Sequence, residues 1–356
     1  MQIHHIFAFL LLSQSFFACQ PVQEQVQSLA ASSIGLSCQT ADPQDSAKVR
    51  PMAANAVFQS MDGGRTWQDA SAGLPDKLQV QGVFSSGNDV FVTSGNALYR
   101  RSNASIAPAW EQILVLGTIN AVAPGQKGLY ASSYERGLFQ NVPGTIVWEN
   151  RSKTLKDKSV RTVLETPDGA VLVGTDSGIF KSVDGGENWK QVFSKGMVLD
   201  LVASGDVLIG GGTQGVLRST DGGEHWDNVL NENIMAKKTA RLKDHFVAIL
   251  GTEDPQKPNP DGITSRLRAS ADGGKTWKRL EQPLFPLQTY DMDVSLLPAL
   301  DIYDIVQLGE NLFCSFDTGV FRSSDQGKTW ERVFGKSGFN LAVSGGVIYA
   351  VPGGGC

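Results

Sequence analysis

The sequence predicts an all-β protein that folds as a single seven-bladed β-propeller with four-stranded blades. Three observations predict it: an eight-residue pattern that recurs five times, seven tryptophans at blade-like intervals, and 39 glycines among 356 residues. Because glycine supplies the positive φ of tight turns and destabilises helices, a glycine-rich chain favours a turn-rich β fold.

The recurring pattern has the form Ser-x-Asp-Gly-Gly-x-x-Trp, with glutamine replacing the first glycine in the last copy. The five copies are Ser60–Trp67, Ser182–Trp189, Ser219–Trp226, Ser270–Trp277 and Ser323–Trp330. The two remaining tryptophans, Trp110 and Trp148, follow strand-like segments but lack the aspartate and the glycines. Successive tryptophans are 37 to 53 residues apart. A propeller blade takes ~40 to 50 residues, so seven tryptophans predict seven blades.

The segment from residue 160 to residue 193 shows the four strands of one blade. Strand-like runs at Val160–Thr166, Val171–Thr175, Ile179–Ser182 and Trp189–Phe193 are rich in β-branched and aromatic residues and are bounded by Gly, Asp or Pro. We name these strands A to D in chain order. The recurring pattern then forms the turn between strands C and D.

The two ends of the chain are predicted to complete one another. The C-terminal part supplies only strands A and B, at Asn340–Ser344 and Val347–Val351, and the N-terminal part only strands C and D, at Ala56–Gln59 and Thr66–Asp69. Pairing them in a shared blade removes the open edges that a curved array would expose. Residues 54–356 are therefore predicted to form one propeller domain.

Residues 1–18 are predicted to be a lipoprotein signal peptide. The apolar run Ile6–Leu12 is too short to span a bilayer, and Phe16–Cys19 resembles a bacterial lipobox, in which the cysteine becomes lipid-modified. The phenylalanine three positions before the cysteine, and His4 and His5 in place of basic residues, depart from that pattern. An ordinary signal peptide cut nearby, or a start site placed too late, are the alternatives.

A lipid on Cys19 would make residues 19–53 a flexible tether for the propeller. We then expect the protein in the bacterial cell envelope, anchored to the outer membrane and facing the periplasm or the cell surface.

The charge of the chain excludes one class of partner. The formal net charge is -5, the isoelectric point is about 5.5, and no run of basic residues is present. The electrostatic footprint of a nucleic-acid-binding protein is therefore missing. We expect a monomer that uses no cofactor and no metal.

The recurring aspartates are predicted to be structural and not catalytic. A carboxylate at the start of the turn can accept backbone N–H groups across the bend, the glycines permit positive φ, and the tryptophan covers the hairpin. The pattern recurs around the ring, whereas a catalytic group or calcium site is needed once. The residues concerned are Asp62, Asp184, Asp221, Asp272 and Asp325, with Trp67, Trp189, Trp226, Trp277 and Trp330.

The pattern resembles the Asp-box of BNR-repeat propellers, a set that includes sialidases, sortilin-type receptors, xyloglucan-cleaving glycosidases and seven-bladed photosystem II assembly and stability factors. The resemblance covers residues from about 54 to 351. It implies the fold and leaves the activity open, because these families share the boxes and not the chemistry. It also implies that ligands meet the face opposite the boxes, which is made by the B–C and D–A loops.

Two long loops are predicted on that opposite face. One is a B–C loop at residues 251–262 that contains Asp254, and the other is a D–A loop at residues 281–301 that contains Tyr290. Long loops often carry function, so both residues are candidate ligand contacts. Tolerated surface insertions are the alternative.

A ring of polar residues is predicted around the central channel near its mouth. Alignment of the innermost strands gives a polar second residue in six of them: Gln81, Asn120, Arg161, Asp200, Asp304 and Asn340. Tyr134, Glu135 and Arg136 are predicted to lie above this ring. A solvated channel lining explains these residues, and a concave polar ligand site is the alternative.

These features predict a non-catalytic binding or assembly module that engages an envelope protein or polysaccharide through the face opposite the Asp-boxes. The alternative is a glycoside hydrolase. A sialidase-like exo-glycosidase could use Arg136, Arg161 and Arg241 to grip a carboxylate and Tyr134 with Glu135 as nucleophile. The Arg-Ile-Pro signature of sialidases is absent, however, and seven blades are one too many. Xyloglucanases place their cleft between two propellers, and this chain has one.

The remaining cysteines have separate expectations. Cys314 lies in a predicted B strand and is expected to be a buried free thiol. Cys38 and Cys356 flank the propeller, and a disulfide between them would pin the closing blade in an oxidising compartment. One sequence leaves that pairing open.

Overall fold

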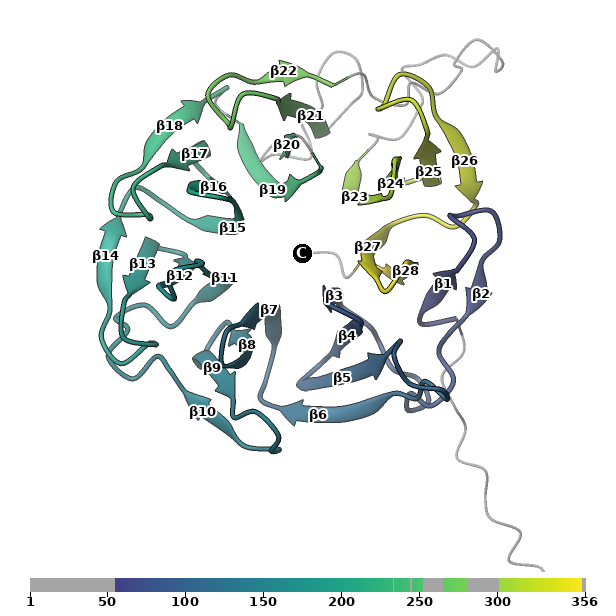
Figure 1. Cartoon of the computed structure of the whole chain (residues 1–356), viewed down its shortest axis with the longest axis horizontal. Coiled ribbons are helices and arrows are strands. Elements are labelled where there is room, and N and C mark those ends of the chain that lie inside the picture. Colours follow the sequence, from purple (N-terminus) through teal and green to yellow (C-terminus); the bar gives the residue numbers. More distant parts are fainter. Residues whose placement is uncertain (1–54, 233, 244, 252–264, 281–300, 354–356) are drawn as a thin grey trace, which may run out of the picture. The chain divides into compact units, whose positions relative to one another are not determined.

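The computed structural model describes residues 55–232, 234–243, 245–251, 265–280 and 301–353. In these ranges it contains 28 strands and no helix, arranged as seven antiparallel four-stranded sheets around a ring (Figure 1). The predicted seven-bladed β-propeller is therefore confirmed. No helix long and apolar enough to cross a membrane occurs in the described ranges.

We number the blades I to VII, starting with the blade that contains both chain ends. Listed from the innermost strand outward, they are: blade I, β27 (Phe339–Ser344), β28 (Val347–Pro352), β1 (Phe58–Ser60), β2 (Gln68–Asp69); blade II, β3 (Gly82–Ser86), β4 (Asp89–Ser94), β5 (Ala97–Ser102), β6 (Glu111–Val115); blade III, β7 (Ile119–Gly125), β8 (Gly128–Ser133), β9 (Gly137–Asn141), β10 (Trp148–Asn150); blade IV, β11 (Val160–Glu165), β12 (Val171–Thr175), β13 (Gly178–Ser182), β14 (Lys190–Phe193); blade V, β15 (Val198–Ser204), β16 (Val207–Gly212), β17 (Gly215–Ser219), β18 (Asp227–Leu230); blade VI, β19 (Met235–Arg241), β20 (Phe246–Gly251), β21 (Ser265–Ser270), β22 (Lys278–Arg279); blade VII, β23 (Ile302–Leu308), β24 (Asn311–Phe316), β25 (Gly319–Ser323), β26 (Glu331–Phe334).

The alternating strand directions give the ring two different faces. The turn face carries the A–B and C–D turns of every blade, for example residues 103–109 and 142–147. The mouth face carries the B–C turns and the D–A connections, for example residues 134–136 and 176–177. Each inner strand begins at the mouth face and runs toward the turn face.

Blade I is closed by hydrogen bonding between the two ends of the chain, as predicted. Strand β1 pairs antiparallel with β28, with Phe58 opposite Ala350 and Ser60 opposite Ile348. Ser71, which follows β2, reinforces the junction because its buried Oγ accepts hydrogen bonds from the backbone N–H groups of Ala56 and Val57, both at 2.9 Å.

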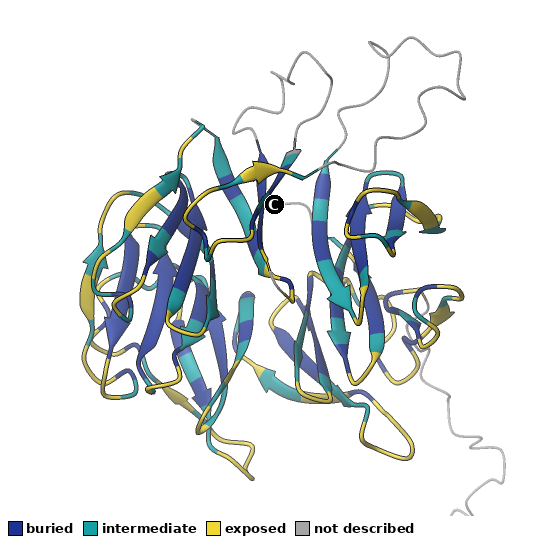
Figure 2. Ribbon diagram, turned by 45° about the horizontal axis from the view of Figure 1, so that its top comes forward, coloured by how far each residue is buried: buried dark blue, intermediate teal, exposed yellow. Residues whose placement is uncertain are grey.

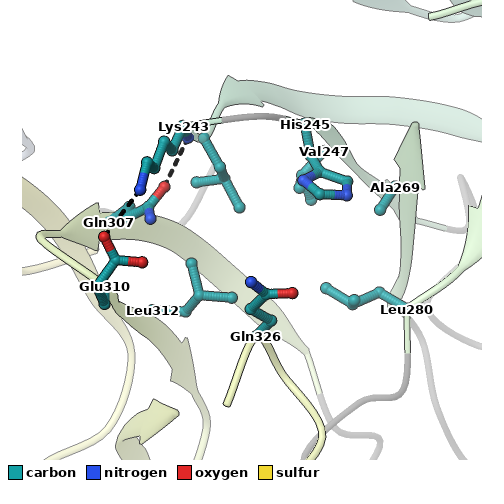
Figure 3. Close-up of a pocket in the computed structure, with 10 residues that line it drawn as sticks. Lys243, His245, Val247, Ala269, Leu280, Gln307, Glu310, Leu312 and Gln326 are labelled. Atoms are coloured by element: carbon teal, nitrogen blue, oxygen red, sulfur yellow. Dashed lines mark hydrogen bonds and ion pairs between the residues drawn. The ribbon is translucent and has the colours of Figure 1, made fainter. Parts of the chain in front are cut away.

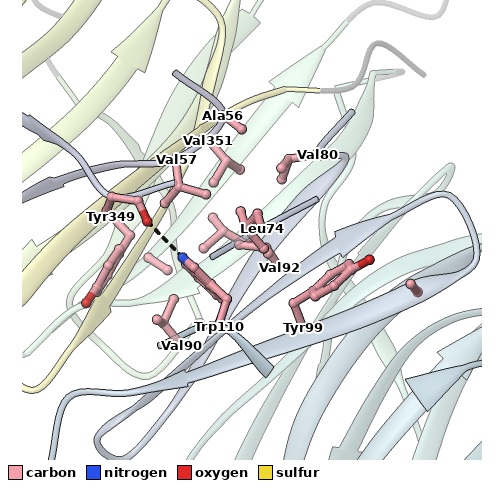
Figure 4. Packing of buried hydrophobic residues seen from close by; sticks show 14 residues of the cluster. Ala56, Val57, Leu74, Val80, Val90, Val92, Tyr99, Trp110, Tyr349 and Val351 are labelled. Carbon is pink, nitrogen blue, oxygen red and sulfur yellow. Dashed lines mark hydrogen bonds between the residues drawn. The ribbon is translucent and has the colours of Figure 1, made fainter. Parts of the chain in front are cut away.

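The cores lie between neighbouring sheets. In Figure 4, buried side chains of blade I, such as Val57 and Tyr349, pack with Val92 and Trp110 of blade II. These residues alternate along their strands with side chains that face the other side of the sheet, as expected when each blade is sandwiched by two neighbours. Burial of this apolar area is the main force that holds adjacent blades together.

The two tryptophans outside the recurring pattern still join neighbouring blades. The indole N–H of Trp110 donates to the carbonyl of Ala70 at 2.8 Å, and that of Trp148 donates to the carbonyl of Ile113 at 3.1 Å. Trp189 makes the corresponding bond to a carbonyl of its preceding blade at 2.8 Å. The aspartate and the glycines can thus be lost while the contact of the tryptophan with the preceding blade is kept.

The five recurring segments, which we call the aspartate turns, share one hydrogen-bond arrangement. In each, the serine Oγ–H donates to the aspartate, and the aspartate accepts the backbone N–H of the residue four positions after it. The glycine four positions after the serine donates its N–H to the serine Oγ, and the tryptophan indole N–H donates to the carbonyl of the same glycine. The serine to aspartate distance is 2.8 Å in every copy.

These hydrogen bonds favour the charged form of the aspartates. The pKa is lowered to about 2 for Asp62 and Asp184, with the backbone N–H four residues on as the largest cause, and to about 2 for Asp325, where the Thr329 hydroxyl is the largest cause. A lowered pKa in the folded state stabilises the fold above the ordinary pKa of 3.8. That contribution is lost as the pH falls toward 2.

We expect Ser71→Ala to weaken the closing blade, because it removes the acceptor of two buried N–H groups. The free energy of unfolding should fall by about 1–3 kcal/mol. Urea unfolding followed by tryptophan fluorescence measures this change. Ser105→Ala, at an exposed turn position, is the matched control and should change stability by less than about 0.5 kcal/mol. Equal effects of the two substitutions would contradict the role of Ser71 in closure.

Candidate functional site

Asparagines on the inner strands join neighbouring blades near the mouth face. The Asn120 side-chain amide donates to the carbonyl of Val160 in the next blade at 3.0 Å. The Asn340 amide likewise donates to the carbonyl of Gln81 at 3.4 Å. Each asparagine therefore joins two inner strands that belong to different sheets.

Aspartates make the complementary bridge in the other half of the ring. Asp200 accepts the backbone N–H of Thr239, and Asp304 accepts the backbone N–H of Leu341, both at 2.9 Å. The second oxygen of each carboxylate accepts the N–H of the residue that follows it, at 3.0 Å for Asp200 and 2.7 Å for Asp304. These two carboxylates thus have a fixed orientation.

The sequence analysis placed Asp200 and Asp304 at the same position of their inner strands as Arg161, and this placement is wrong by one residue. The inner strands contain β-bulges whose register shifts put Arg161, Leu199 and Tyr303 at equivalent places. Asp200 and Asp304 follow these places by one residue. A bulge adds one residue to a strand and leaves no clear mark on its hydrophobic pattern. The one-residue difference between these aspartates and Arg161 was therefore not visible in the sequence.

A lysine that the sequence analysis missed lies beside both aspartates. Lys238 Nζ is 2.7 Å from an Asp304 carboxylate oxygen, and the Asp304 side chain is 1% exposed whereas that of Lys238 is 37% exposed. Lys238 lies on β19, the one inner strand that the alignment omitted. The signal that could have found it is the pair of adjacent lysines, Lys237 and Lys238, at the bulge of β19, where the other inner strands carry at most one basic residue, Arg161.

The charges around Asp200 and Lys238 shift the pKa of both residues. Burial, with a smaller effect of the Asp304 charge, raises the pKa of Asp200 to about 6, although Lys238 and two N–H groups act in the opposite direction. For Lys238, burial acts to lower the pKa, but the charges of Asp304 and Asp200 outweigh it and the pKa is raised. Asp200 therefore changes charge between the ordinary pKa of an aspartate and neutral pH.

A second cluster on the mouth face joins blades III and IV. Asp176 accepts the Tyr134 hydroxyl at 2.8 Å and pairs with Arg161 at 2.8 Å, and the Arg161 guanidinium lies 4.4 Å from the centre of the Tyr134 ring. Glu135 and Arg136 are exposed in the same B–C turn as Tyr134. The sequence predicted Tyr134 and Arg161 but missed Asp176, which opens the next B–C turn.

A third cluster lies at the start of blade VII. Asp317 accepts the Tyr303 hydroxyl at 2.7 Å and the backbone N–H of Asp301 at 2.6 Å. The Asp301 carboxylate in turn lies 3.2 Å from Lys237 of blade VI. The hydrogen bond to Asp317 is the largest cause that raises the pKa of Tyr303 to about 12, so this tyrosine stays protonated at neutral pH.

The three arginines that the sialidase-like alternative would need do not lie together. Arg161 lies at the start of β11, near the mouth face, whereas Arg241 is the last residue of β19, at the turn face. Arg136 is exposed in its turn. Within the described ranges, no group of three or more His, Cys, Asp or Glu side chains is arranged to hold a metal ion.

A small cavity lies between blades VI and VII at the turn face (Figure 3). Its volume is about 100 Å³, its walls include Leu242 and Leu312, and its rim carries Lys243, Gln307 and Glu310. The Lys243 backbone N–H donates to the Gln307 side chain at 2.6 Å, and its Nζ lies 2.9 Å from Glu310. Ligand pockets usually measure about 300–1,000 Å³, so this cavity is too small to be the main ligand site.

Several predicted residues lie outside the described ranges. These are Cys19, Cys38, Asp254, Tyr290 and Cys356. The signal peptide, the tether, the two long loops and the candidate disulfide therefore remain predictions. Cys314 is described: it is buried in β24 as a free thiol, as predicted, and burial raises its pKa.

No protein-family model and no curated protein matches the sequence. Solved structures do match the fold. A GH74 enzyme from Niastella koreensis matches with 15% identity and a TM-score of 0.53, over 71% of this chain and 44% of that one. YCF48 from Cyanidioschyzon merolae matches with 16% identity and a TM-score of 0.52, over 84% of this chain and 89% of that one.

The extracellular domain of a one-component system from B. thetaiotaomicron also matches, with 11% identity and a TM-score of 0.52, over 71% of this chain and 33% of that one. This chain thus spans less than half the length of the GH74 enzyme and of the sensor domain. At these identities the likeness establishes the β-propeller fold and nothing about activity.

The raised pKa of Asp200 predicts that its contribution to the free energy of unfolding grows as the pH falls, whereas the contribution of the aspartate turns shrinks. Because its folded-state pKa of about 6 exceeds the ordinary 3.8, the folded protein binds the extra proton, and the free energy of unfolding should rise by about 2 kcal/mol as the pH falls from 7 to 4.5. Asp200→Asn should abolish this rise in urea-unfolding measurements across that range. Asp206→Asn, at an exposed turn of the same blade, should retain it, and parallel pH profiles for all three proteins would refute the assignment.

Proposed function

We propose that this chain is a non-catalytic binding or assembly module of the bacterial envelope, anchored by a lipid on Cys19, that recognises a protein or a glycan with its mouth face. The Asp-box resemblance supports a propeller of this kind, in which the boxes hold the hairpins together and ligands meet the opposite face. The anchor rests on the lipobox-like Phe16–Cys19.

The observation that carries the binding proposal is the fixed geometry of the mouth face. The partly exposed Asp176 and Asp317 each hold a defined cation, hydroxyl or backbone N–H at 2.6 to 2.8 Å. Such pre-arranged polar groups lose little side-chain entropy when a partner binds. The exposed Glu135 and Arg136 lie in the same turn as Tyr134, the partner of Asp176, and offer charged contacts at the rim.

Hydrolysis is the second candidate, and one observation favours it. A glycosidase needs one carboxyl group with a raised pKa near another that stays charged. Asp200 has a pKa raised to about 6, and the charge of Asp304 lies close enough to contribute to that shift. Against it, Asp304 is 1% exposed and is held by Lys238, and both oxygens of Asp200 already accept backbone N–H groups. Neither carboxylate is arranged to approach a glycosidic bond.

Site-specific photo-crosslinking tests the proposed face. A benzoylphenylalanine replaces Glu135 on the mouth face or, as the matched control, Lys127 on the turn face of the same blade; both positions are exposed. After irradiation of intact cells we expect a discrete adduct from position 135 and none from position 127, because only the mouth face contacts the partner.

The same preparations separate the two candidate functions. The module proposal predicts no release of reducing ends from envelope polysaccharide by the wild-type protein. Release that is lost in Asp200→Asn would favour the hydrolase. Adducts formed equally from both positions, or only from position 127, would contradict recognition by the mouth face.

A further inference from the structure

Five of the six large apolar side chains that are exposed in the described ranges lie in the C–D turns of four consecutive blades. We call them the apolar arc: Met61 in blade I, Ile106 in blade II, Ile146 and Val147 in blade III, and Val183 in blade IV. Ile106 is fully exposed and Ile146 is 89% exposed. The sixth, Val115, ends β6 and lies at the mouth face.

The topology puts the whole arc on one face of the ring. Every C–D turn lies at the turn face, and blades I to IV are neighbours around the ring (Figure 1). In Figure 2 exposed turns line the lower edge of the ring, at the ends of the strands. A single flat surface can therefore meet side chains from all four blades at once.

The two middle turns of the arc differ from the aspartate turns in charge. Residues 103–109 and 142–147 contain no charged side chain, and residues 104–109 and 143–147 are all exposed. The aspartate turns at the equivalent place in the other blades each carry an aspartate and at least one further charged residue. The loss of the pattern in blades II and III thus removes the charge and leaves an exposed isoleucine.

The backbone of the blade III turn is satisfied largely by its own residues. The Val142 N–H donates to the Val147 carbonyl at 2.9 Å, the Thr145 N–H donates to the Val142 carbonyl at 3.1 Å, and the Asn141 amide donates to the Thr145 and Val147 carbonyls at 3.1 and 3.3 Å. Backbone groups that are already bonded can leave water at low free-energy cost. This turn can therefore enter an apolar medium while Ile146 points outward.

We infer that the apolar arc is a membrane-contact surface, whose side chains enter the apolar edge of a phospholipid bilayer. The tips are single side chains spaced blade by blade on a rigid ring, and a deformable lipid surface accepts such tips without a matching pocket for each. Asp62 and Asp184 flank the arc, so attraction to anionic lipids does not explain the contact. Insertion of uncharged side chains does.

The inference rests on the lipid anchor of the proposed function. Between Cys19 and Asn55, where blade I begins to be described, lie 35 residues, which can span at most about 120 Å. The anchor therefore keeps the ring near the bilayer, and a weak apolar contact becomes populated through the high effective concentration. The turn face then meets the membrane and the mouth face points away from it, free for a partner.

Depth-dependent quenching tests the contact. The full chain, purified from bacterial membranes, is reconstituted in phosphatidylcholine vesicles with an environment-sensitive fluorescent amino acid at position 146 or, as control, at position 115. Brominated lipids should quench position 146 and shift its emission to the blue, and should leave position 115 unchanged. In the chain with Cys19→Ser, the substitutions Ile106→Ser and Ile146→Ser together should lower vesicle binding about tenfold, whereas Val115→Ser should not.

The outcomes separate the anchor from the arc. Protein that pellets with vesicles while position 146 remains unquenched would overturn the membrane contact and leave the anchor standing. Wild-type protein that stays in the supernatant would overturn the anchor and the inference together. A blue shift at position 146 that requires an added membrane protein, and is absent with lipid alone, would also overturn the bilayer as partner. Thermal unfolding of the double variant should match the wild type, since both isoleucines are exposed.

Discussion

The pairing of β1 with β28 is the constraint on which the rest of the structure depends. Without it, blade I would consist of two separate hairpins, β1 with β2 and β27 with β28, each with an open edge. The hairpin of β1 and β2 is held by only two residue pairs. A ring of sheets held only by apolar packing could open at that junction. Closure holds neighbouring inner strands at fixed positions relative to one another.

Because the ring is closed, single side chains can join one blade to the next near the mouth face. Asn120 and Asn340 lie where the neighbouring strand presents a carbonyl, and they donate an amide hydrogen; Asp200 and Asp304 lie where it presents an N–H, and they accept. The residue type at each bridge thus follows from the backbone group opposite. The same bridges hold the charged groups of the mouth face in place, while the aspartate turns hold the hairpins of the other face.

Much of the fold could be predicted from sequence, since the tryptophan spacing gave seven blades and the strand pattern at each chain end gave the shared blade. The aspartate turns could also be predicted from chemistry, because a carboxylate at the start of a tight turn can accept the backbone N–H groups across the bend. The mouth face was predicted only in part. Tyr134 and Arg161 were found, but Asp176 and Lys238 were not, because they come from other blades and only the three-dimensional ring brings them together. The bulges that displace Asp200 and Asp304 have no clear sequence signature.

We assign different tasks to the two faces, and both tasks depend on a ring that does not open. Amide hydrogen exchange tests this most directly, because Thr239 and Leu341 donate the N–H groups that join the blades at the mouth. We expect these two amides to exchange as slowly as the amides shared by β1 and β28, at a rate set by global unfolding. Exchange at Thr239 and Leu341 that is orders of magnitude faster, while β1 and β28 stay protected, would contradict it.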